Sequence, residues 1–307
     1  MQSEPIRIGT RGSPLALIQA RETRSRLMQA LGLDEEAFEI VVITTTGDRI
    51  RDRPLSEIGG KGLFTKEIEE ALFDRRIDLA VHSAKDMPTV LPDGLGLTAF
   101  LPREDVRDAF IGRAAKTLED LPKGAVVGSS SLRRAALVRS LRPDVDVIQF
   151  RGNVETRLKK LEDGVADATL LAYSGLRRMG LSDVVTSLLD PQDFVPAVAQ
   201  GAICIESRLD DDRTLERVAQ INDAETESRV RAERAFLHVL DGSCRTPIAG
   251  HARLDSGQMH LDALIVKPDG TLVHRTDRNG SATDGEALGR DAGAELKALA
   301  GPDFFTP

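Results

Sequence analysis

The sequence lacks the features that mark membrane, secreted and disulfide-stapled proteins. No apolar stretch approaches the run of roughly 18 to 20 residues that a membrane-spanning helix requires. The first residues, Met1-Gln-Ser-Glu-Pro5, lack the basic and apolar regions of a secretory signal. Only two cysteines occur among 307 residues, and their surroundings differ too much for a disulfide framework. We therefore expect a cytoplasmic protein that makes no contact with a membrane.

Charge, composition and length also indicate what class of protein this is. The net charge of −8 argues against a general nucleic-acid binder, because such proteins carry an excess of lysine and arginine. Apolar residues make up 41% and charged residues 29% of the chain, which is ordinary for a globular protein. A length of 307 residues exceeds what one hydrophobic core usually supports, so two or three domains are expected.

One of the two cysteines stands in a turn near the C-terminus. The apolar spacing of residues 225–240 predicts a helix that ends near Gly242, which adopts left-handed backbone angles without a steric penalty. Pro247 prevents a helix from resuming before the next apolar strand. Cys244 lies between these signals and is either a small turn residue or a nucleophile that anchors a group covalently. Cys204 lies in an apolar run and is predicted to fill the core.

The N-terminal part opens with a strand that turns into a helix. The strand is predicted for residues 6–9, and the helix starts with Ser13 as N-cap and Pro14 at the first helical position. The free N–H groups of the helix and the neighbouring Arg11 favour a site for a carboxylate or phosphate. Plain capping beside a solvated arginine explains the same residues equally well.

A later strand of this part ends at a pair of opposite charges. A strand at residues 38–46 comes first, followed by a charged, glycine-containing loop at 47–62 that is predicted to be a lid. After a helix at 63–73, the strand at 77–81 runs into His82-Ser-Ala-Lys-Asp86. Active-site groups of open α/β sheets gather beyond the carboxyl ends of strands. The last two residues of this motif are therefore either site groups or members of a surface turn.

A second unit repeats this pattern and supplies arginine at each strand end. Its strands are predicted at residues 125–128, 145–150 and 168–172. The first leads into a helix at 132–141 whose first turn holds two cations, which the helix dipole disfavours unless an anion binds there. Arginine binds carboxylates with two parallel hydrogen bonds, so the pattern predicts a polyanionic ligand. The residues concerned are Arg133, Arg134, Arg151, Arg157, Arg177 and Arg178.

The remaining segments connect these units and add a third. Residues 91–107 are rich in proline and glycine, and the apolar residues 194–203 are interpreted as a return crossing into the first unit. After the helix at 225–240, strands are expected near 248–254, 259–266 and 271–275, joined by hairpin-length turns. A final helix at 286–300 completes a small antiparallel α+β domain.

Six motifs occur in order along nearly the whole chain: Thr10-Arg-Gly-Ser-Pro-Leu-Ala-Leu17, Gly59-Gly-Lys-Gly-Leu-Phe64, His82-Ser-Ala-Lys-Asp86, Gly128-Ser-Ser-Ser-Leu-Arg-Arg134, Arg151-Gly-Asn-Val154 and the segment around Gly242-Ser-Cys244. Together they resemble the motifs of the porphobilinogen deaminase (hydroxymethylbilane synthase) family. The resemblance implies an α/β fold of two periplasmic-binding-protein-like (type II) lobes, with the chain crossing twice between them, and a C-terminal α+β domain. It places lobe 1 at residues 1–101 and 198–219, lobe 2 at 102–197 and the C-terminal domain at 220–307.

The same resemblance implies an activity. The enzyme would condense four porphobilinogen molecules head to tail, release ammonia each time and hydrolyse off a linear tetrapyrrole, acting as a monomer on porphobilinogen and the growing polypyrrole chain. Cys244 would hold a dipyrromethane cofactor through a thioether, and no metal is implied. Asp86 matches the catalytic carboxylate, which would stabilise the positive charge on a pyrrole ring and shuttle protons to the leaving amine.

The acetate and propionate groups of each pyrrole ring would account for the cations at the strand ends. For the cofactor, the resemblance implies contacts from Lys85, Ser83, Ser129, Ser131, Arg133, Arg134 and Arg151. For the substrate, it implies contacts from Arg11, Ser13, Arg157, Arg178, Lys61 and Gln200.

Other classes of function remain open at this stage. A two-lobed binding protein would grip a carboxylate ligand without chemistry, but the missing signal sequence, Cys244 and the pair formed by Lys85 and Asp86 count against it. A regulatory anion sensor would need a DNA-reading unit, and none precedes the first lobe. A pyridoxal enzyme with Lys85 as its Schiff-base lysine has no independent support. The sequence therefore favours an enzyme.

Overall fold

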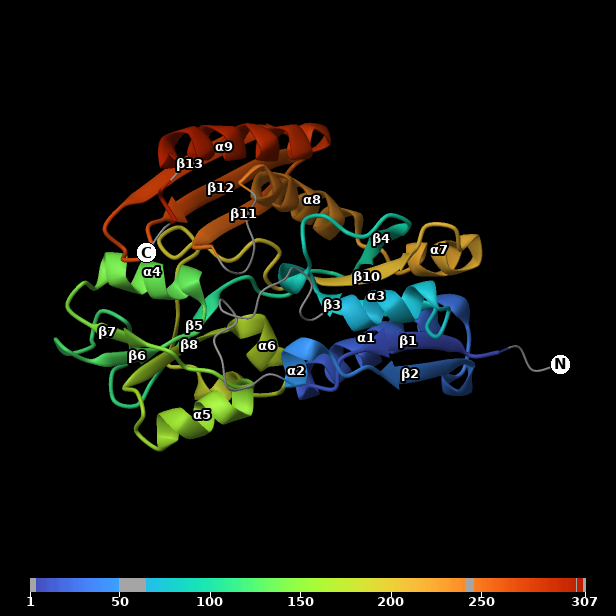
Figure 1. Cartoon of the computed structure of the whole chain (residues 1–307), viewed down its shortest axis with the longest axis horizontal. Coiled ribbons are helices and arrows are strands. Elements are labelled where there is room, and N and C mark those ends of the chain that lie inside the picture. The colour runs from blue at the N-terminus through green and yellow to red at the C-terminus, as the bar shows by residue number, and fades with distance from the viewer. Residues whose placement is uncertain (1–3, 50–64, 241–245, 302, 306–307) are drawn as a thin grey trace. The chain divides into compact units, whose positions relative to one another are not determined.

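The computed structural model describes residues 4–49, 65–240, 246–301 and 303–305 of the chain. The backbone forms two compact units, one of Met1–Glu104 and Ala202–Glu227 and the other of Asp105–Gly201 and Ser228–Pro307. The colour gradient of Figure 1 follows the chain out of the first unit, back into it and out again. Within the described ranges, no helix is long and apolar enough to cross a bilayer.

The first unit is built on a five-stranded sheet of order β2-β1-β3-β10-β4. Its strands are β1 (Ile6–Thr10), β2 (Phe38–Val42), β3 (Leu79–Ser83), β4 (Leu95–Phe100) and β10 (Ile203–Arg208). β1 pairs in parallel with β2 and β3, whereas β10 runs antiparallel to β3 and β4. The carboxyl ends of the parallel strands therefore meet at one edge of the sheet.

Helices cover both faces of this sheet, which explains why the central strand β3 is buried along most of its length. Leu79 and Val81 of β3 share a core with α1 (Pro14–Leu31) and α7 (Asp212–Ala219). Ala80 lies between them in the strand, so it points to the opposite face, where it packs with α3 (Lys66–Phe73). A short helix, α2 (Thr46–Arg49), follows β2.

The second unit contains a sheet of the same design, of order β7-β6-β8-β5-β9. Its strands are β5 (Asp108–Gly112), β6 (Val126–Gly128), β7 (Asp146–Ile148), β8 (Ala168–Ala172) and β9 (Ser187–Leu188). β6 pairs in parallel with β7 and β8, and β5 runs antiparallel to β8. The connecting helices are α4 (Leu132–Leu141), α5 (Val154–Glu162) and α6 (Tyr173–Arg178). The predicted echo of the first unit is confirmed.

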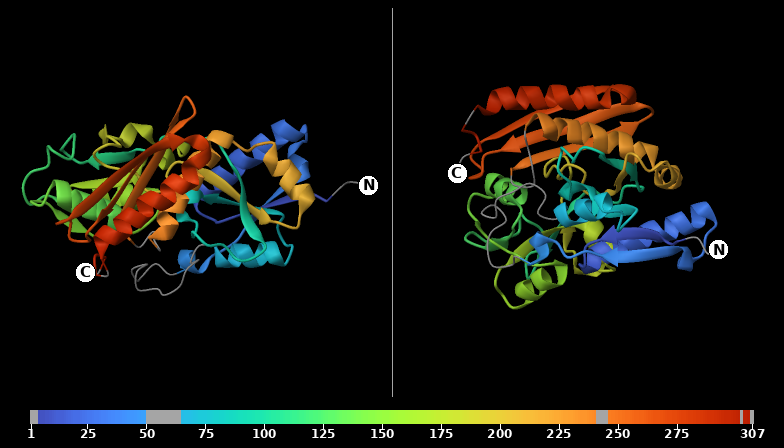
Figure 2. Two further views of the ribbon diagram at one scale, coloured as in Figure 1. Left: turned by 90° about the horizontal axis from the view of Figure 1, so that it is seen from above. Right: turned by 45° about the vertical axis from the view of Figure 1, so that its right-hand side comes forward.

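A three-stranded antiparallel sheet forms the C-terminal part of the second unit. It consists of β11 (Ile248–Asp255), β12 (Gln258–Val266) and β13 (Val273–Ser281). The helix α9 (Gly285–Ala300) lies along this sheet in both views of Figure 2, and α8 (Ala224–Val239) precedes it in the chain. A Cβ atom on Gly289 of α9 would lie 2.2 Å from the carbonyl oxygen of Ala232, so the two helices approach closely only because glycine stands there.

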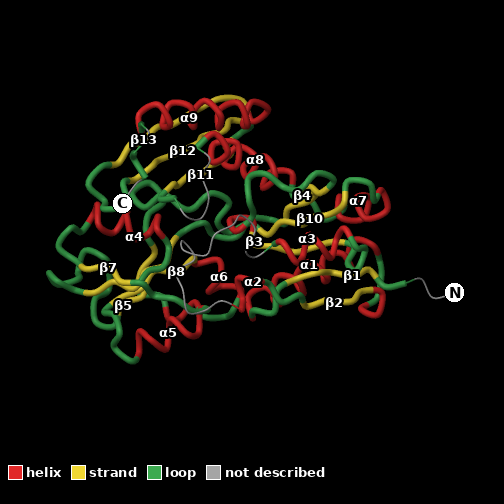
Figure 3. The backbone as a smooth tube through the Cα atoms, viewed as in Figure 1, coloured by secondary structure: helices red, strands yellow, loops and turns green. Residues whose placement is uncertain are grey.

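The fold is therefore an α/β protein with two similar lobes and an antiparallel α+β domain, as predicted; Figure 3 shows the strands of the three sheets among the helices. Ala249, Leu264 and Val266 of the C-terminal sheet share one hydrophobic core with Phe110 and Val127 of the second lobe. This shared core explains why Ser228–Pro307 belongs to the same compact unit as Asp105–Gly201. The bounds of the three separate domains stay predictions.

The sequence predicted some elements to the residue and missed others. The predicted bounds of α4 and β8 are confirmed, and so is the cap of α1, where the Ser13 hydroxyl accepts a hydrogen bond from the Ala16 N–H. The strand predicted for residues 38–46 was too long, because β2 ends at Val42. Two strands, β4 and β5, were missed in and just after the stretch that proline and glycine made look like a loop.

Candidate functional site

A pocket lies at the edge of the first lobe's sheet where β1 and β3 end. It encloses about 80 Å³. The turn between β1 and α1 contributes Arg11 and Ser13, and the segment after β3 contributes Ser83 and Asp86. The other residues of its wall are Leu15, Ala16, Gln19, Thr65, Val81, His82 and Met87. The structure thus brings together two groups of site residues that the sequence predicted separately.

Asp86 is presented to solvent at this pocket. It ends a single 3₁₀ turn (Ala84–Asp86) that follows β3, and the turn is anchored because the Ala84 N–H donates to the carbonyl oxygen of Ala202 at 3.0 Å. The Asp86 side chain is exposed and makes no hydrogen bond or ion pair with any residue that the structure describes. A carboxylate held on a fixed turn without a partner among the described residues is available to a bound ligand. The neighbouring Lys85 is half-buried.

Ser83 is oriented by a buried glutamine. Its hydroxyl accepts from Nε2 of Gln19 at 2.9 Å and donates to Oε1 of the same side chain at 3.1 Å. Gln19 is only 3% exposed and lies on the second turn of α1. Gln19 was not among the predicted site residues, and its one signal in the sequence was its place as a polar residue on the helix face that also carries the buried Ala20 and Thr23.

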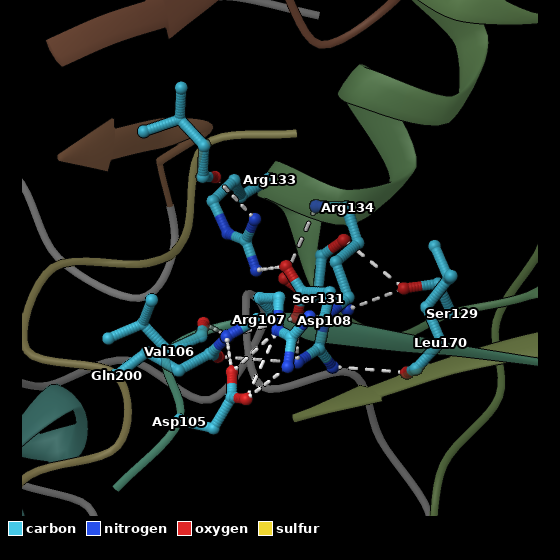
Figure 4. A network of polar contacts seen from close by, with 11 residues as sticks. Asp105, Val106, Arg107, Asp108, Ser129, Ser131, Arg133, Arg134, Leu170 and Gln200 are labelled. Carbon is cyan, nitrogen blue, oxygen red and sulfur yellow. Dashed lines mark hydrogen bonds and ion pairs between the residues drawn. The ribbon is translucent and has the colours of Figure 1, made fainter. Parts of the chain in front are cut away.

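The first two predicted arginines of the second lobe are buried together against one carboxylate. Figure 4 shows Arg133 and Arg134 converging on Asp108, the first residue of β5. Nη2 of Arg133 lies 2.7 Å from one Asp108 oxygen, and Nε of Arg134 lies 2.8 Å from the other. Backbone carbonyl groups of Val195 and Leu170 accept further hydrogen bonds from the pair. The anion that the sequence required at this helix N-terminus is therefore present within the chain.

The electrostatics of this cluster follow from complete burial. Burial alone would raise the pKa of Asp108, but the charges of Arg133 and Arg134 outweigh it and lower the pKa to about 2. Burial lowers the pKa of the Arg133 guanidinium, and the positive charge of Arg134 adds to this while Asp108 opposes it. One buried carboxylate thus holds two guanidinium groups, so the cluster keeps an excess of positive charge. Asp108 was missed by sequence analysis, because a single acid before an apolar run carries no motif.

Gln200 ties this cluster to the segment that leads into β10. Its Nε2 donates to the carbonyl oxygen of Val106 at 2.8 Å and to Asp108 at 3.1 Å, and its Oε1 accepts from Arg134 at 3.4 Å. Figure 4 shows this side chain beside Arg107, which makes a two-pronged ion pair with Asp105. Gln200 is fully buried, so it positions the arginines in this structure.

For the next two predicted arginines, the described residues record no carboxylate partner, although Nε of Arg157 donates to the carbonyl oxygen of Gly152 at 2.9 Å. Arg157 is half-buried on α5, and its pKa is lowered to about 10 by burial first and then by the charges of Arg134 and Arg151. Nη1 of Arg151 is buried and has no hydrogen-bond partner among the residues described. Three guanidinium groups therefore repel one another in this region, with Asp108 as the only carboxylate whose bonds to them the structure records. Such a region favours an anionic ligand.

The serines of this lobe have structural partners as well. The Ser131 hydroxyl caps α4 by accepting from the Arg134 N–H at 3.4 Å, and the Ser129 hydroxyl accepts from the Ser131 N–H at 3.3 Å. Arg178, at the end of α6, donates to the carbonyl oxygen of Gly201 at 3.1 Å. Ligand contacts of these residues stay predictions. Cys244 and Lys61 lie outside the described residues.

Comparison with protein families gives two matches in chain order. Residues 6–216 match the family described as "Porphobilinogen deaminase, dipyromethane cofactor binding domain", and residues 228–298 match "Porphobilinogen deaminase, C-terminal domain". Among curated proteins, the porphobilinogen deaminase of Paracoccus denitrificans is 58% identical over 301 residues, covering 98% of this chain and 96% of that protein.

Two solved structures that match the chain do so at low sequence identity. A putative methionine-binding lipoprotein from Bacillus subtilis is 13% identical, with a TM-score of 0.44, covering 73% of this chain and 92% of that one. A periplasmic binding protein from Salmonella typhimurium with high arginine specificity is 12% identical, with a TM-score of 0.40, covering 71% and 92%.

Proposed function

The chain belongs to the porphobilinogen deaminase family, and we propose that the pocket at Asp86 and the arginines of the second lobe carry out that family's reaction. The reaction is a transfer: porphobilinogen molecules are joined head to tail with loss of ammonia, and the linear tetrapyrrole hydroxymethylbilane is released by hydrolysis. A protein that binds carboxylates without chemistry is not favoured, since the curated relative is a deaminase over nearly its whole length.

The observation that carries the assignment of residues is the excess of positive charge in the second lobe. Dipyrromethane, when bound, supplies the primer to which the first porphobilinogen is joined. Its acetate and propionate groups fit a region where a buried nitrogen of Arg151 has no partner among the described residues and where burial and neighbouring cations lower the pKa of Arg157. Arg133, Arg134, Ser129 and Ser131 would complete this set, and Cys244 would carry the thioether.

Asp86 would perform the proton and charge chemistry. A porphobilinogen ring that loses its aminomethyl nitrogen becomes electron-poor, and the ring that attacks it becomes cationic. A carboxylate stabilises that charge and accepts hydrogen bonds from pyrrole N–H groups. Asp86 suits this role because it is fixed on an anchored turn and is not engaged by another described side chain.

The remaining cations would orient the substrate. Arg11 and Ser13 stand at the N-terminus of α1, where free N–H groups and the helix dipole favour a carboxylate. Lys85 and Ser83 flank Asp86, and Arg178, Gln200 and Lys61 complete the proposed substrate contacts. The cytoplasm is the proposed compartment and the monomer the proposed state, with no part for nucleic acid.

The intact mass of the purified protein tests this proposal. We expect the wild-type mass to exceed the sequence mass by two linked pyrrole units, and Cys244→Ala to show the bare sequence mass. Cys204→Ala is the matched control, because Cys204 is completely buried in β10 and should leave the adduct unchanged.

A wild-type mass equal to the sequence mass calls for incubation with porphobilinogen or with preformed hydroxymethylbilane. If neither adds mass at Cys244, the proposed attachment is wrong. If mass is added but ammonia is not released from porphobilinogen, the proposed reaction is wrong.

A further inference from the structure

A buried glutamate of α8 holds two backbone segments of the second unit at once. Oε2 of Glu233 accepts a hydrogen bond from the Ala199 N–H at 2.6 Å, and Oε1 accepts one from the Ala252 N–H, on β11, at 2.7 Å. The Glu233 side chain is 0% exposed. A carboxylate this deeply buried is costly unless it is paired or hydrogen-bonded. The two bonds offset that cost, and they join the segment of residues 195–200 to the C-terminal sheet.

Ala199 has a backbone conformation that alanine rarely adopts. Its φ is +60°, in the left-handed region where a Cβ atom crowds the backbone. The other non-glycine residues with positive φ in the described ranges, Arg75 and Ser256, are exposed, whereas Ala199 is fully buried. Such a conformation persists only where surrounding contacts determine it. The hydrogen bond to Glu233 is a contact of this kind.

The residue after Ala199 is Gln200, whose side chain binds the arginine cluster. Its amide group contacts Asp108 and Arg134, as Figure 4 shows. Its backbone N–H donates to the carbonyl oxygen of Ala197 at 2.9 Å, so a tight turn sets the direction of the side chain. A change in the backbone angles of Ala199 would therefore move the amide group away from the arginine cluster.

Two further contacts hold the same segment between the arginine cluster and the C-terminal domain. The carbonyl oxygen of Val195 accepts from Nη1 of Arg133 at 2.7 Å, and the carbonyl oxygen of Pro196 accepts from the Gly250 N–H, on β11, at 3.1 Å. The segment thus connects the arginines to α8 and β11, and α8 is the helix that precedes Cys244 in the chain.

We propose that Glu233 is a positioning residue for ligand binding. By holding Ala199 in the left-handed conformation, it keeps Gln200 against Arg134, so that the guanidinium group meets the carboxylate groups of the ligand in one orientation. This inference rests on the proposed function, which assigns the binding of acetate and propionate groups to this cluster. It gives Glu233 no contact with the ligand.

The test removes the carboxylate and then removes the need for it. Glu233→Met keeps a similar length but loses both hydrogen bonds, because a thioether is a weak acceptor. Ala199→Gly allows the left-handed conformation without a steric cost, so it is made alone and combined with Glu233→Met. Met259→Ala is the control, because Met259 is buried in the same domain, beside Gly285 of α9. Intact mass and thermal unfolding of each variant reveal any loss of the adduct or of the fold.

We expect Glu233→Met to keep its adduct and to lower kcat/KM for porphobilinogen by about tenfold, mainly through KM, because misplaced groups bind the ligand less well. The double variant should return to within about threefold of Ala199→Gly alone. Met259→Ala should lower the melting temperature and leave KM unchanged. A Glu233→Met enzyme with the wild-type KM overturns the proposal. A loss that glycine at position 199 does not restore also overturns it, since Glu233 then serves the fold alone.

Amide hydrogen exchange of the wild-type holoenzyme covers the case in which Glu233→Met does not fold. We expect the Ala199 N–H to exchange as slowly as the Ala252 N–H, because one carboxylate holds both. Excess porphobilinogen should slow the exchange at Ala199 further, since a ligand that binds the ordered segment stabilises it. Rapid exchange at Ala199, or exchange that porphobilinogen leaves unchanged, contradicts the proposal. A wild type that releases no ammonia from porphobilinogen shows instead that the proposed function is wrong, before any variant is compared.

Discussion

The two lobes share one sheet design, but the charged groups at the ends of their parallel strands differ. In the first lobe, the turn after β3 holds Asp86, an exposed carboxylate without a described partner. In the second lobe, the turn after β6 leads to Arg133 and Arg134, which are buried and share a single carboxylate. The same scaffold therefore presents an exposed acid in one copy and a buried pair of arginines in the other.

The two arrangements also differ in what they contribute to stability. Asp86 contributes little, because an exposed side chain without partners loses nothing when it is replaced. Asp108 and its two arginines are a structural unit, since removal of one member leaves a buried charge uncompensated. Substitutions in the first lobe should therefore act on turnover, and substitutions in the second on stability and ligand affinity together.

The largest effect is expected for Asp86→Asn. The amide keeps the size of the side chain but neither carries negative charge nor accepts a proton, so kcat should fall by about 10²- to 10⁴-fold. The melting temperature should stay within about one degree of the wild type, because Asp86 has no described partner to lose. Initial rates of ammonia release and a thermal melt provide the two numbers.

Asp86→Glu is the matched variant for this prediction, because it restores the charge at a displaced position. It should recover part of the lost rate. If Asp86→Asn retains more than a tenth of the wild-type kcat, the reaction does not depend on this carboxylate. The first lobe then does not supply the catalytic acid.

Asp108→Asn should have the next largest effect, this time on stability. It leaves two buried guanidinium groups without a counter-charge, and we expect a loss of about 3–5 kcal/mol in the free energy of unfolding. Denaturant titration measures it. Asp105→Asn is the control, because that carboxylate bonds the more exposed Arg107 and its loss should cost far less. Equal losses in the free energy of unfolding for the two variants would contradict the prediction that the buried Asp108 pairs stabilise the fold more than the more exposed Asp105 pair.

The pH dependence of stability provides a second view of Asp108. Its pKa is about 2 in the folded protein, below the ordinary 3.8 of an aspartate. The stabilisation is therefore complete above the ordinary value and is lost as the pH falls towards 2. The stability of Asp108→Asn should fall less steeply than that of the wild type across this window.

The sequence predicted much of the fold because its signals were local. Ser13 and Pro14 mark the start of α1 through capping chemistry, and the structure confirms the hydrogen bond that they imply. The repetition of strand, polar turn and helix in the second lobe was visible for the same reason. The positions at strand ends followed from the sheet rule, which is why Arg11 and Asp86 were expected at one edge and are found in one pocket.

What the sequence could not supply was long-range pairing. Asp108 meets Arg133 across 25 positions, and His82 meets Glu206 across 124. Nothing local to these acids distinguishes them from the other carboxylates of an acidic chain. β4 and β5 were missed for a related reason. Glycine and proline in this stretch suggested a loop, but the residues form strands because they pair with β10 and β8, which are distant in sequence.

The smallest effect, and the sharpest contrast within one helix, is expected for Arg157→Gln. The folded protein lowers the pKa of Arg157 to about 10, so its charge is disfavoured by folding at neutral pH and its removal should not lower the melting temperature. On the same helix, ion pairs with Asp163 and Glu162 raise the pKa of Lys159, so Lys159→Gln should be slightly destabilising.

Arg157→Gln should nevertheless raise KM for porphobilinogen several-fold, and Lys159→Gln should leave it unchanged. These two results together would indicate that Arg157 serves ligand binding and not the stability of the fold. If Arg157→Gln lowers stability and leaves KM unchanged, the excess positive charge of the second lobe serves the fold. The proposal that this lobe binds the substrate through Arg157 is then wrong.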